Sequence, residues 1–274
     1  MSDLATFLQA RYGAHAEGLP HPDAHPVIEQ ILSHRTVRNF LPDALPAHTL
    51  QTLVAAAQSA PSSSNLQLWS VIAVQSQESR DRLAALAGDQ AHIRQAPLLL
   101  AWLADQSRIE RIAGHKQRTV EALPYLDTYL TATVDAALAA QNVVTAAEAL
   151  GLGTVYIGAL RNRPEEVAQV LGTPKGVFTV FGLVVGHPDP ARPAAIKPRL
   201  PQRSVLHHER YSAPATLQDE IGHYDAELSA FQASQGQPVV GWTEAVLERL
   251  RDARSLNGRD RLAAALREAG FPLR

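Results

Sequence analysis

The pattern of apolar positions divides the chain into many helices and a few short strands. The strongest signal is an alanine-rich stretch at 126–153, which is apolar almost all round and ends at Gly151 and Gly153. A helix of this kind is expected to be central. Shorter periodic segments predict further helices over residues 1–12, 27–40, 46–60, 76–88, 164–172 and, with an interruption at 234–242, from residue 215 onward.

Three runs of strand length lie between these helices, at 69–75, 96–105 and 175–188. The continuous apolar run 96–105 fits a buried strand, although periodicity alone also allows a buried helix. Segments rich in Pro and Gly at 13–26 and 196–211 are interpreted as loops, and 151–162 as a glycine-punctuated turn. Few, separated strands with helices between them favour an α+β or α/β sandwich, with helices on both faces of one sheet.

Composition narrows the possible functions. The chain has 274 residues, a formal net charge of −2 and no cysteine. Disulfides, thiolate metal sites and cysteine nucleophiles are therefore excluded, and a reducing cytoplasm is compatible. The balanced charge gives no general attraction to nucleic acid. The beginning of the sequence does not resemble a signal peptide, and no run is long enough to span a membrane.

Two short segments concentrate positive charge. In "HRTVRNF" (34–40), a helical interpretation places Arg35 and Arg38 on one face, where a phosphate could satisfy both guanidinium groups. In "IKPRLP" (196–201), Lys197 and Arg199 lie on one side of an extended, proline-stiffened segment. Taken alone, each segment could instead be an ordinary charged surface that binds only water.

Two uncharged segments could line a polar ligand. "SAPSSSNLQLW" (59–69) offers hydroxyl and amide groups between a helix and a strand, and "GLGTVYIGALRN" (151–162) would let backbone N–H groups approach a flat ligand. A plain polar loop and a simple helix cap are the alternatives. The sequence has no GxSxG motif and no evident acid–base dyad, so no catalytic side chain is predicted. It has no HExxH motif either, and no metal site is predicted from the histidines that were considered, which are His21, His25, His207 and His208.

Taken in order, these segments resemble the oxygen-insensitive, FMN-dependent nitroreductase and flavin reductase family, in particular its NADPH-linked group. The resemblance covers about residues 27–211. Within this range, two further stretches also match the family pattern, "QAHIRQAP" (90–97) and "VFGLVVGHP" (180–188). It implies an α+β sandwich with a central, mainly antiparallel sheet, and a homodimer with two FMN sites at the interface. It divides the chain into an N-terminal extension (1–26), an FMN-binding core (27–211) and a helical C-terminal extension at the dimer interface (212–274).

The resemblance also assigns flavin-binding residues. His34 and Arg35 would face the phosphate, Arg38 would face the pyrimidine edge of the ring, and Gln90 would contact the ring. The turn beneath the isoalloxazine and the phosphate clamp complete the expected site, which comprises His34, Arg35, Thr36, Arg38, Ser62, Ser64, Gln67, Gln90, Tyr156, Ile157, Gly158, Ala159, Lys197 and Arg199.

The implied activity is a two-step hydride transfer from NADPH or NADH, through FMN, to a nitroaromatic, quinone or similar small acceptor. The alternatives are a reductase that releases reduced FMN, a flavin-binding protein without turnover, and a hydrolase that uses the serine loop. The sequence departs from the family pattern in its N-terminal extension and at Ala159, where relatives have glycine. It also lacks arginines in "SQGQPVVGW" (234–242), which leaves Arg203, Arg249, Arg251 and Arg254 as candidates for an NADPH 2′-phosphate.

Overall fold

The computed structural model describes residues 3–17, 19, 25–212 and 215–274. Its contacts group the chain into two compact units, which are described separately. Unit 1 consists of Met1–Thr36 with Ala194–Ser255, and unit 2 of Val37–Pro193 with Leu256–Arg274.

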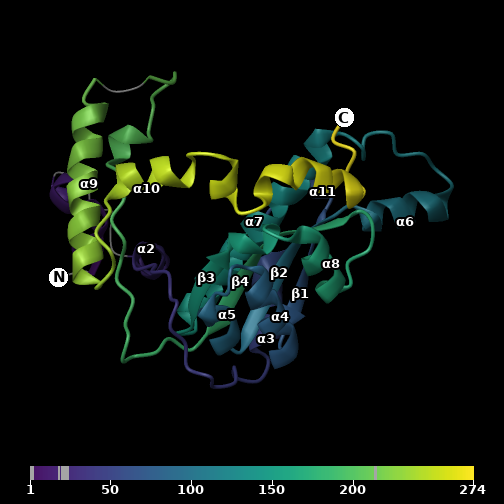
Figure 1. Cartoon of the computed structure of the whole chain (residues 1–274), viewed down its shortest axis with the longest axis horizontal. Helices are drawn as coiled ribbons and strands as arrows, with labels where there is room; N and C mark the ends of the chain where they lie inside the picture. The colour runs from purple at the N-terminus through teal and green to yellow at the C-terminus, as the bar shows by residue number, and fades with distance from the viewer. Residues whose placement is uncertain (1–2, 18, 20–24, 213–214) are drawn as a thin grey trace. The chain divides into compact units, whose positions relative to one another are not determined.

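Unit 2 is built on one antiparallel sheet (Figure 1). Its strands are β1 (Trp69–Val74), β2 (Leu98–Asp105), β3 (Gly153–Ile157) and β4 (Val177–Gly186), in the order β1-β2-β4-β3. Every residue of β2 is buried, as expected for its continuous apolar run. Each neighbouring pair of strands is antiparallel, which confirms the expected sheet.

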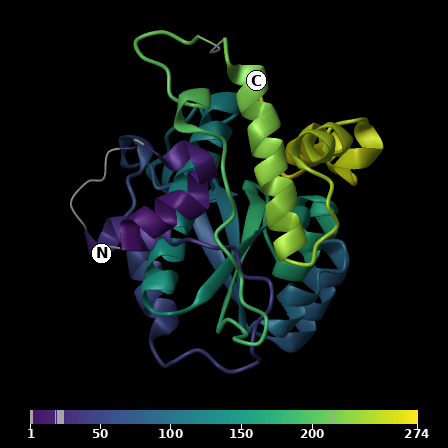
Figure 2. The same cartoon turned by 90° about the vertical axis from the view of Figure 1, so that its left-hand side faces the viewer.

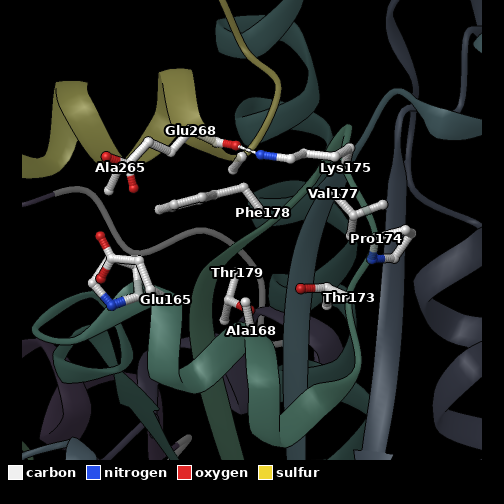
Figure 3. Close-up of a pocket in the computed structure, with 12 residues that line it drawn as sticks. Glu165, Ala168, Thr173, Pro174, Lys175, Val177, Phe178, Thr179, Ala265 and Glu268 are labelled. Atoms are coloured by element: carbon white, nitrogen blue, oxygen red, sulfur yellow. Dashed lines mark hydrogen bonds between the residues drawn. The ribbon is translucent and has the colours of Figure 1, made fainter.

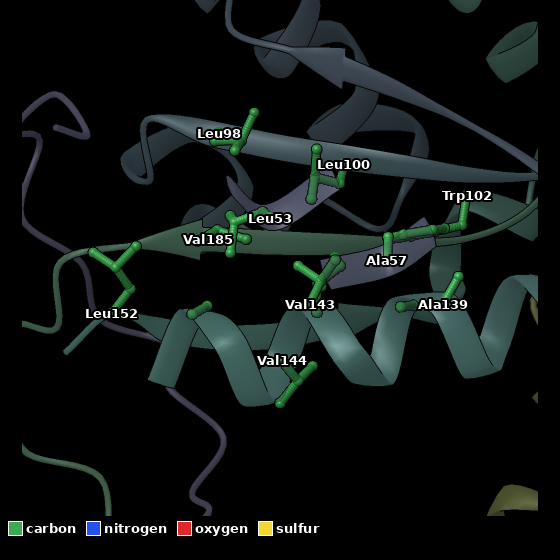
Figure 4. Close-up of a cluster of buried hydrophobic side chains, with 13 residues drawn as sticks. Leu53, Ala57, Leu98, Leu100, Trp102, Ala139, Val143, Val144, Leu152 and Val185 are labelled. Carbon is green, nitrogen blue, oxygen red and sulfur yellow. The ribbon is translucent and has the colours of Figure 1, made fainter. Parts of the chain in front are cut away.

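Helices cover both faces of this sheet. On one face, α3 (Thr49–Gln58) and α7 (Leu126–Ala149) pack against the strands; Figure 4 shows Leu53 and Val143 beside Leu100 and Val185. The opposite face carries α4 (Gln77–Leu86), α5 (Ala91–Gln95), the 3-10 turn η3 (Gly158–Arg161) and α8 (Pro164–Leu171). Two further helices of unit 2 are α6 (Ser107–Lys116) and α11 (Leu262–Glu268). The expected α+β sandwich is thus confirmed.

Unit 1 is helical, with α1 (Asp3–Tyr12), α2 (Pro26–Leu32), α9 (Leu217–Ser234) and α10 (Trp242–Arg249); α1 is purple and α9 green in Figure 2. The rings of Tyr224 and Trp242 meet edge to face at 5.5 Å. Asp225 accepts hydrogen bonds from the amides of Trp242 and Thr243, at 2.5 and 2.7 Å, at the start of α10. The predicted interruption of the helical tail therefore lies between α9 and α10.

Two predictions about local structure were wrong. The helix expected over 27–40 ends at Leu32, and the residues that follow are extended. Val37 and Phe40 are buried at 6 % and 4 % exposure, and the Val37 amide donates to the Thr154 carbonyl at 3.0 Å. The i, i+3 argument that paired Arg35 with Arg38 on a helix face therefore does not hold.

The second error concerns 151–162, where a turn was expected and a strand, β3, was missed. Gly151 does end α7 with φ of 74°, but the chain then pairs with β4. Gly153 is required there because a Cβ atom would lie 2.7 Å from the Val37 side chain. The helices α5 and α6 were not predicted either.

Candidate functional site

Unit 1 contains the predicted phosphate-side residues on two segments that are far apart in sequence, His34–Thr36 and 197–199. One buried side chain, Arg11 of α1, connects them. Its Nη1 donates to the Lys197 carbonyl at 2.8 Å, and its Nη2 donates to the carbonyls of Leu32 and His34 at 3.1 and 3.0 Å. The structure thus brings together two cationic segments that the sequence indicated independently.

The 197–199 segment is further supported by α9. Pro198 is buried between two exposed residues, Lys197 and Arg199, and its carbonyl accepts from the Tyr224 hydroxyl at 3.2 Å. The Lys197 ammonium lies 6.0 Å from the centre of the Phe231 ring. Both cationic side chains therefore lie on the exposed side of a segment whose backbone is fixed.

In unit 2, the serine loop is organised by a carboxylate of α7. Asp135 is 1 % exposed and accepts from the Ser62 hydroxyl at 2.6 Å and from the Ser63 amide at 3.1 Å. Ser62 Oγ in turn accepts from the Gln67 amide at 2.8 Å. Since Ser62 has already donated its only hydroxyl hydrogen, it can offer a ligand only an acceptor lone pair.

This loop has a strained backbone. Ser64, Asn65 and Gln67 have φ angles of 48°, 54° and 51°, in the left-handed region that residues other than glycine seldom occupy. Ser64 is exposed, and within the described residues neither its hydroxyl nor its amide makes a hydrogen bond. Ser64 is therefore one member of the predicted set whose donors are open to a ligand.

Four of the predicted residues of unit 2 line two different cavities. Ser62 and Gln67 lie on a cavity of about 890 Å³, together with Arg108. Gln90 and Ala159 lie on another, of about 610 Å³. Each pair is brought together, but the structure places the two pairs on separate cavities.

The end of β3 presents the predicted ring-side turn. Tyr156 is 41 % exposed and packs edge to face on Phe181 at 5.4 Å, whereas Ile157 is buried. Burial, and secondarily the charge of Glu148, raises the pKa of Tyr156 to about 12, so its hydroxyl stays protonated. Gly158 and Ala159 begin η3 and are half-buried.

The exposed Arg38 acts on a histidine of the neighbouring helix α5. Burial, and secondarily the positive charge of Arg38, lowers the pKa of His92 to about 4. His92 is consequently neutral at physiological pH. The region around Arg38 thus contains one permanent positive charge and one neutral imidazole.

A third cavity of unit 2, of about 330 Å³, contains none of the predicted site residues (Figure 3). In Figure 3, Phe178 lies between residues of α11 and residues of α8. Arg261 holds the Glu165 carboxylate at the edge of this cavity, with distances of 2.5 and 2.7 Å. This cavity is not part of the candidate site.

Metal ligation has no support among the described residues, where no three His, Cys, Asp or Glu side chains come together as ligands could. His25 instead accepts from the Val27 amide at 3.3 Å and caps α2, while His207 packs on Tyr211. His21 lies outside the described residues. No helix in the described part of the chain is long and apolar enough to cross a membrane.

Comparison with known proteins identifies the family. Residues 31–187 match the nitroreductase family, and residues 197–274 match the C-terminal domain of the nitroreductase family. The chain belongs to the nitroreductase family. The resemblance inferred from the sequence is therefore confirmed.

Relatives within the nitroreductase family carry related names. An FMN reductase (NADPH) of Bacillus subtilis is 37 % identical over 227 residues, which is 80 % of this chain and 89 % of that protein. An oxygen-insensitive NADPH nitroreductase of Salmonella typhimurium is 36 % identical over 212 residues, covering 77 % of this chain and 84 % of that protein.

A solved structure of the NADPH:FMN oxidoreductase from Vibrio harveyi, complexed with NAD⁺, superposes with a TM-score of 0.80 at 33 % identity. The superposition covers 91 % of this chain and all of that one. Nitroreductase A from Vibrio parahaemolyticus gives a TM-score of 0.81 at 33 % identity, with 92 % of this chain and all of that one covered.

Sequence analysis missed two residues that organise the candidate site, Arg11 and Asp135. Asp135 did leave a signal, because it is a single carboxylate in the middle of an alanine-rich helix and must find a partner if buried. Arg11 left none, since an arginine near the end of a short polar helix is ordinary.

Proposed function

We propose that this chain is an FMN-dependent NAD(P)H oxidoreductase that reduces nitroaromatics, quinones or related small acceptors in two half-reactions. One observation carries the proposal. In unit 1, the guanidinium of Arg11 binds the backbones of the two segments that carry the predicted cationic side chains, 34–36 and 197–199. Family membership supports the same cofactor, because relatives are named as FMN reductases and as an NADPH nitroreductase.

The residues present suit a flavin phosphate in charge and in the hydrogen-bond donors they offer. Arg35, Lys197 and Arg199 are exposed on segments with ordered backbones. Guanidinium groups donate paired hydrogen bonds to phosphate oxygens, and an ammonium group adds a point charge. In the proposed site His34 and Thr36 complete the phosphate side.

The ring side is assigned to unit 2. When bound, FMN supplies the redox chemistry of both half-reactions. Arg38 is proposed to place positive charge at the pyrimidine edge, which favours electron uptake there. Ser64 donates to the ligand, Gln67 and Gln90 orient the ring, and the residues Tyr156–Ala159 form its floor. No side chain acts as acid or base in this scheme, so no catalytic residue is assigned.

We propose that the active form is a homodimer, located in the cytoplasm, where both nicotinamide nucleotides are available. On α7, Leu126, Leu130, Val134 and Leu138 recur every fourth residue and are 40–55 % exposed. Such an apolar stripe is typical of a surface that another protein covers. The placement of Ser62 and Gln67 on one cavity and of Gln90 and Ala159 on another also suits a site completed by a second copy.

The boundaries of the three segments are part of the same proposal. Residues 27–211 would form the FMN-binding core, residues 212–274 a helical extension at the dimer interface, and residues 1–26 an N-terminal extension.

The test is the absorption spectrum of the protein after addition of excess FMN and desalting. We expect about one FMN per chain, and oxidation of NADPH that depends on an added quinone or nitroaromatic. A colourless protein after desalting would refute the proposal, and bound flavin without NAD(P)H oxidation would indicate a flavin-binding protein without turnover.

A reductase that releases reduced FMN is the second candidate, because the Bacillus subtilis relative is named for FMN reduction. The two activities differ in what free FMN does to the rate. If FMN is a substrate, NADPH oxidation rises with free FMN well beyond one equivalent per chain. If FMN is only the bound cofactor, the rate saturates once the site is filled.

A further inference from the structure

Arg11 lies outside both segments of the chain that match the nitroreductase family, 31–187 and 197–274. It belongs to α1, yet it is 7 % exposed and therefore buried in unit 1. A buried guanidinium is costly unless its donors are satisfied. The groups that receive its hydrogen bonds should therefore be fixed in place by it.

Those groups lie in the two phosphate-side segments or, for Leu32, at the end of α2 just before the first of them. The carbonyls of Leu32 and His34 accept from Nη2, and the carbonyl of Lys197 accepts from Nη1. A fourth contact runs in the opposite direction, because the Arg199 amide donates to the Arg11 carbonyl at 2.8 Å. Side chain and backbone of one residue thus hold both segments.

The geometry depends on the planar fork of arginine. Its Nη atoms point in fixed, divergent directions, so one guanidinium can bind carbonyls on two chains at once. A lysine at this position would keep the charge but would present its three donors from a single nitrogen. Charge and bridging can therefore be separated by substitution.

We propose that Arg11 is a positioning residue for the cofactor phosphate: it holds the His34–Thr36 and Lys197–Arg199 segments in the arrangement that binds a phosphate dianion before the ligand arrives. This inference rests on the proposed function. Preorganised donors lose less conformational freedom on binding, so the benefit of Arg11 appears as affinity for ligands that carry the phosphate.

The test compares FMN with riboflavin, which has the same ring and ribityl chain but no phosphate. Dissociation constants are measured by flavin fluorescence for wild type, Arg11→Lys and Arg11→Leu. The matched control is Leu4→Ala, which removes a side chain of the same helix that is 1 % exposed and makes no hydrogen bond to either segment. We expect both Arg11 variants to lose about tenfold in FMN affinity while riboflavin affinity changes less than about twofold.

The ratio of FMN to riboflavin affinity decides between the possibilities. The proposal would be overturned if this ratio were unchanged in both Arg11 variants. It would also be overturned if the ratio fell equally in Leu4→Ala, because α1 would then act only through general stability. A ratio that falls in Arg11→Leu but not in Arg11→Lys would also overturn it, since charge rather than bridging would be responsible. Wild-type protein that binds neither flavin would instead refute the proposed function.

A measurement on wild type covers the case in which the variants do not fold. The Arg199 amide should exchange its hydrogen slowly in FMN-free protein, because its bond to the Arg11 carbonyl is formed before the ligand binds. Fast exchange that becomes slow only after FMN is added would show that the arrangement is not preformed, and would overturn the inference.

Discussion

Arg203 is bound to a carboxylate of its own unit: its Nε donates to Glu220, a residue that is only 1 % exposed. Ser204 and Thr216 also donate to that carboxylate. Burial alone would raise the pKa of Glu220, but these hydrogen bonds and the ion pair outweigh it and lower the pKa to about 2. Glu220 is therefore ionised at every physiological pH and holds Arg203 throughout.

The remaining arginine candidates for an NADPH 2′-phosphate are also engaged locally. Arg251 pairs with Glu248 at 2.8 Å, Arg254 pairs with Asp252 at 3.0 Å, and Arg249 donates to the Ser255 carbonyl. We therefore predict that both donors are accepted, with a kcat/KM ratio of NADPH over NADH below about a hundred. The ratio is measured at one pH and ionic strength with a single quinone acceptor.

Arg203→Ala should leave that ratio unchanged within about threefold, because Arg203 is already committed to Glu220. A tenfold fall in the ratio, with NADH kinetics unaffected, would show that Arg203 contacts the 2′-phosphate after all.

Arg199→Ala should weaken FMN binding by about 1.5–3 kcal/mol, or about ten- to a hundredfold, because a charge-assisted contact to the phosphate is lost. Arg254→Ala is the matched control: it removes the same charge from a side chain that is 89 % exposed. Equal FMN affinities in the two variants would exclude Arg199 from the phosphate site.

Val134→Glu should disrupt the dimer. The side chain is 55 % exposed in the single chain, so the monomer tolerates a carboxylate, whereas a covered interface would bury it without a partner. Light scattering at micromolar concentration should show a dimer for wild type and a monomer for the variant. Gln169→Glu, which adds the same charge at an exposed position of α8, should remain dimeric. A dimeric Val134→Glu would place the interface elsewhere.

Asp135→Asn should lower the free energy of unfolding by about 1.5–3 kcal/mol and weaken FMN binding, because the Ser62 hydroxyl loses its charged acceptor and the left-handed loop loses its support. The same substitution at Asp127, exposed in the first turn of α7, should cost only about 0.3–1 kcal/mol and leave FMN affinity unchanged. Urea unfolding and flavin titration measure the two effects; equal effects of the two substitutions on both would contradict the role given to Asp135.

His92 makes stability depend on pH in a defined window. Its pKa is about 4 in the folded chain against 6.5 normally, so between these values the unfolded state binds a proton that the folded state refuses. Its presence should therefore cost nothing above pH 6.5 and destabilise the fold increasingly as the pH falls towards 4. His92→Gln should flatten the stability profile in this window.

Arg38→Gln tests the cause of that shift. Nuclear magnetic resonance titration of the His92 ring should show the pKa rising part of the way towards 6.5, because burial, the larger cause, remains. A pKa that does not move would mean that Arg38 lies too far away to act on His92.

The sequence by itself determined the elements whose signals are local. The alanine-rich stretch indicated α7, the continuous apolar runs indicated β2 and β4, and Gly151 marked the end of the long helix. The candidate site residues could also be predicted from the sequence, because charged and hydroxyl residues cluster within single short segments. The order of those segments along the chain indicated the family.

Only the tertiary structure decided what depends on contacts between distant residues. Residues 34–40 have a helical pattern. The burial of Val37 beside β3 and of Phe40 beside the end of β4 nevertheless stabilises the extended form more than helix propensity opposes it. Arg11 and Asp135 act through partners between 21 and 186 positions away, so the sequence around them does not identify those partners. Their functions arise because a buried charge must find donors or acceptors wherever the fold places them.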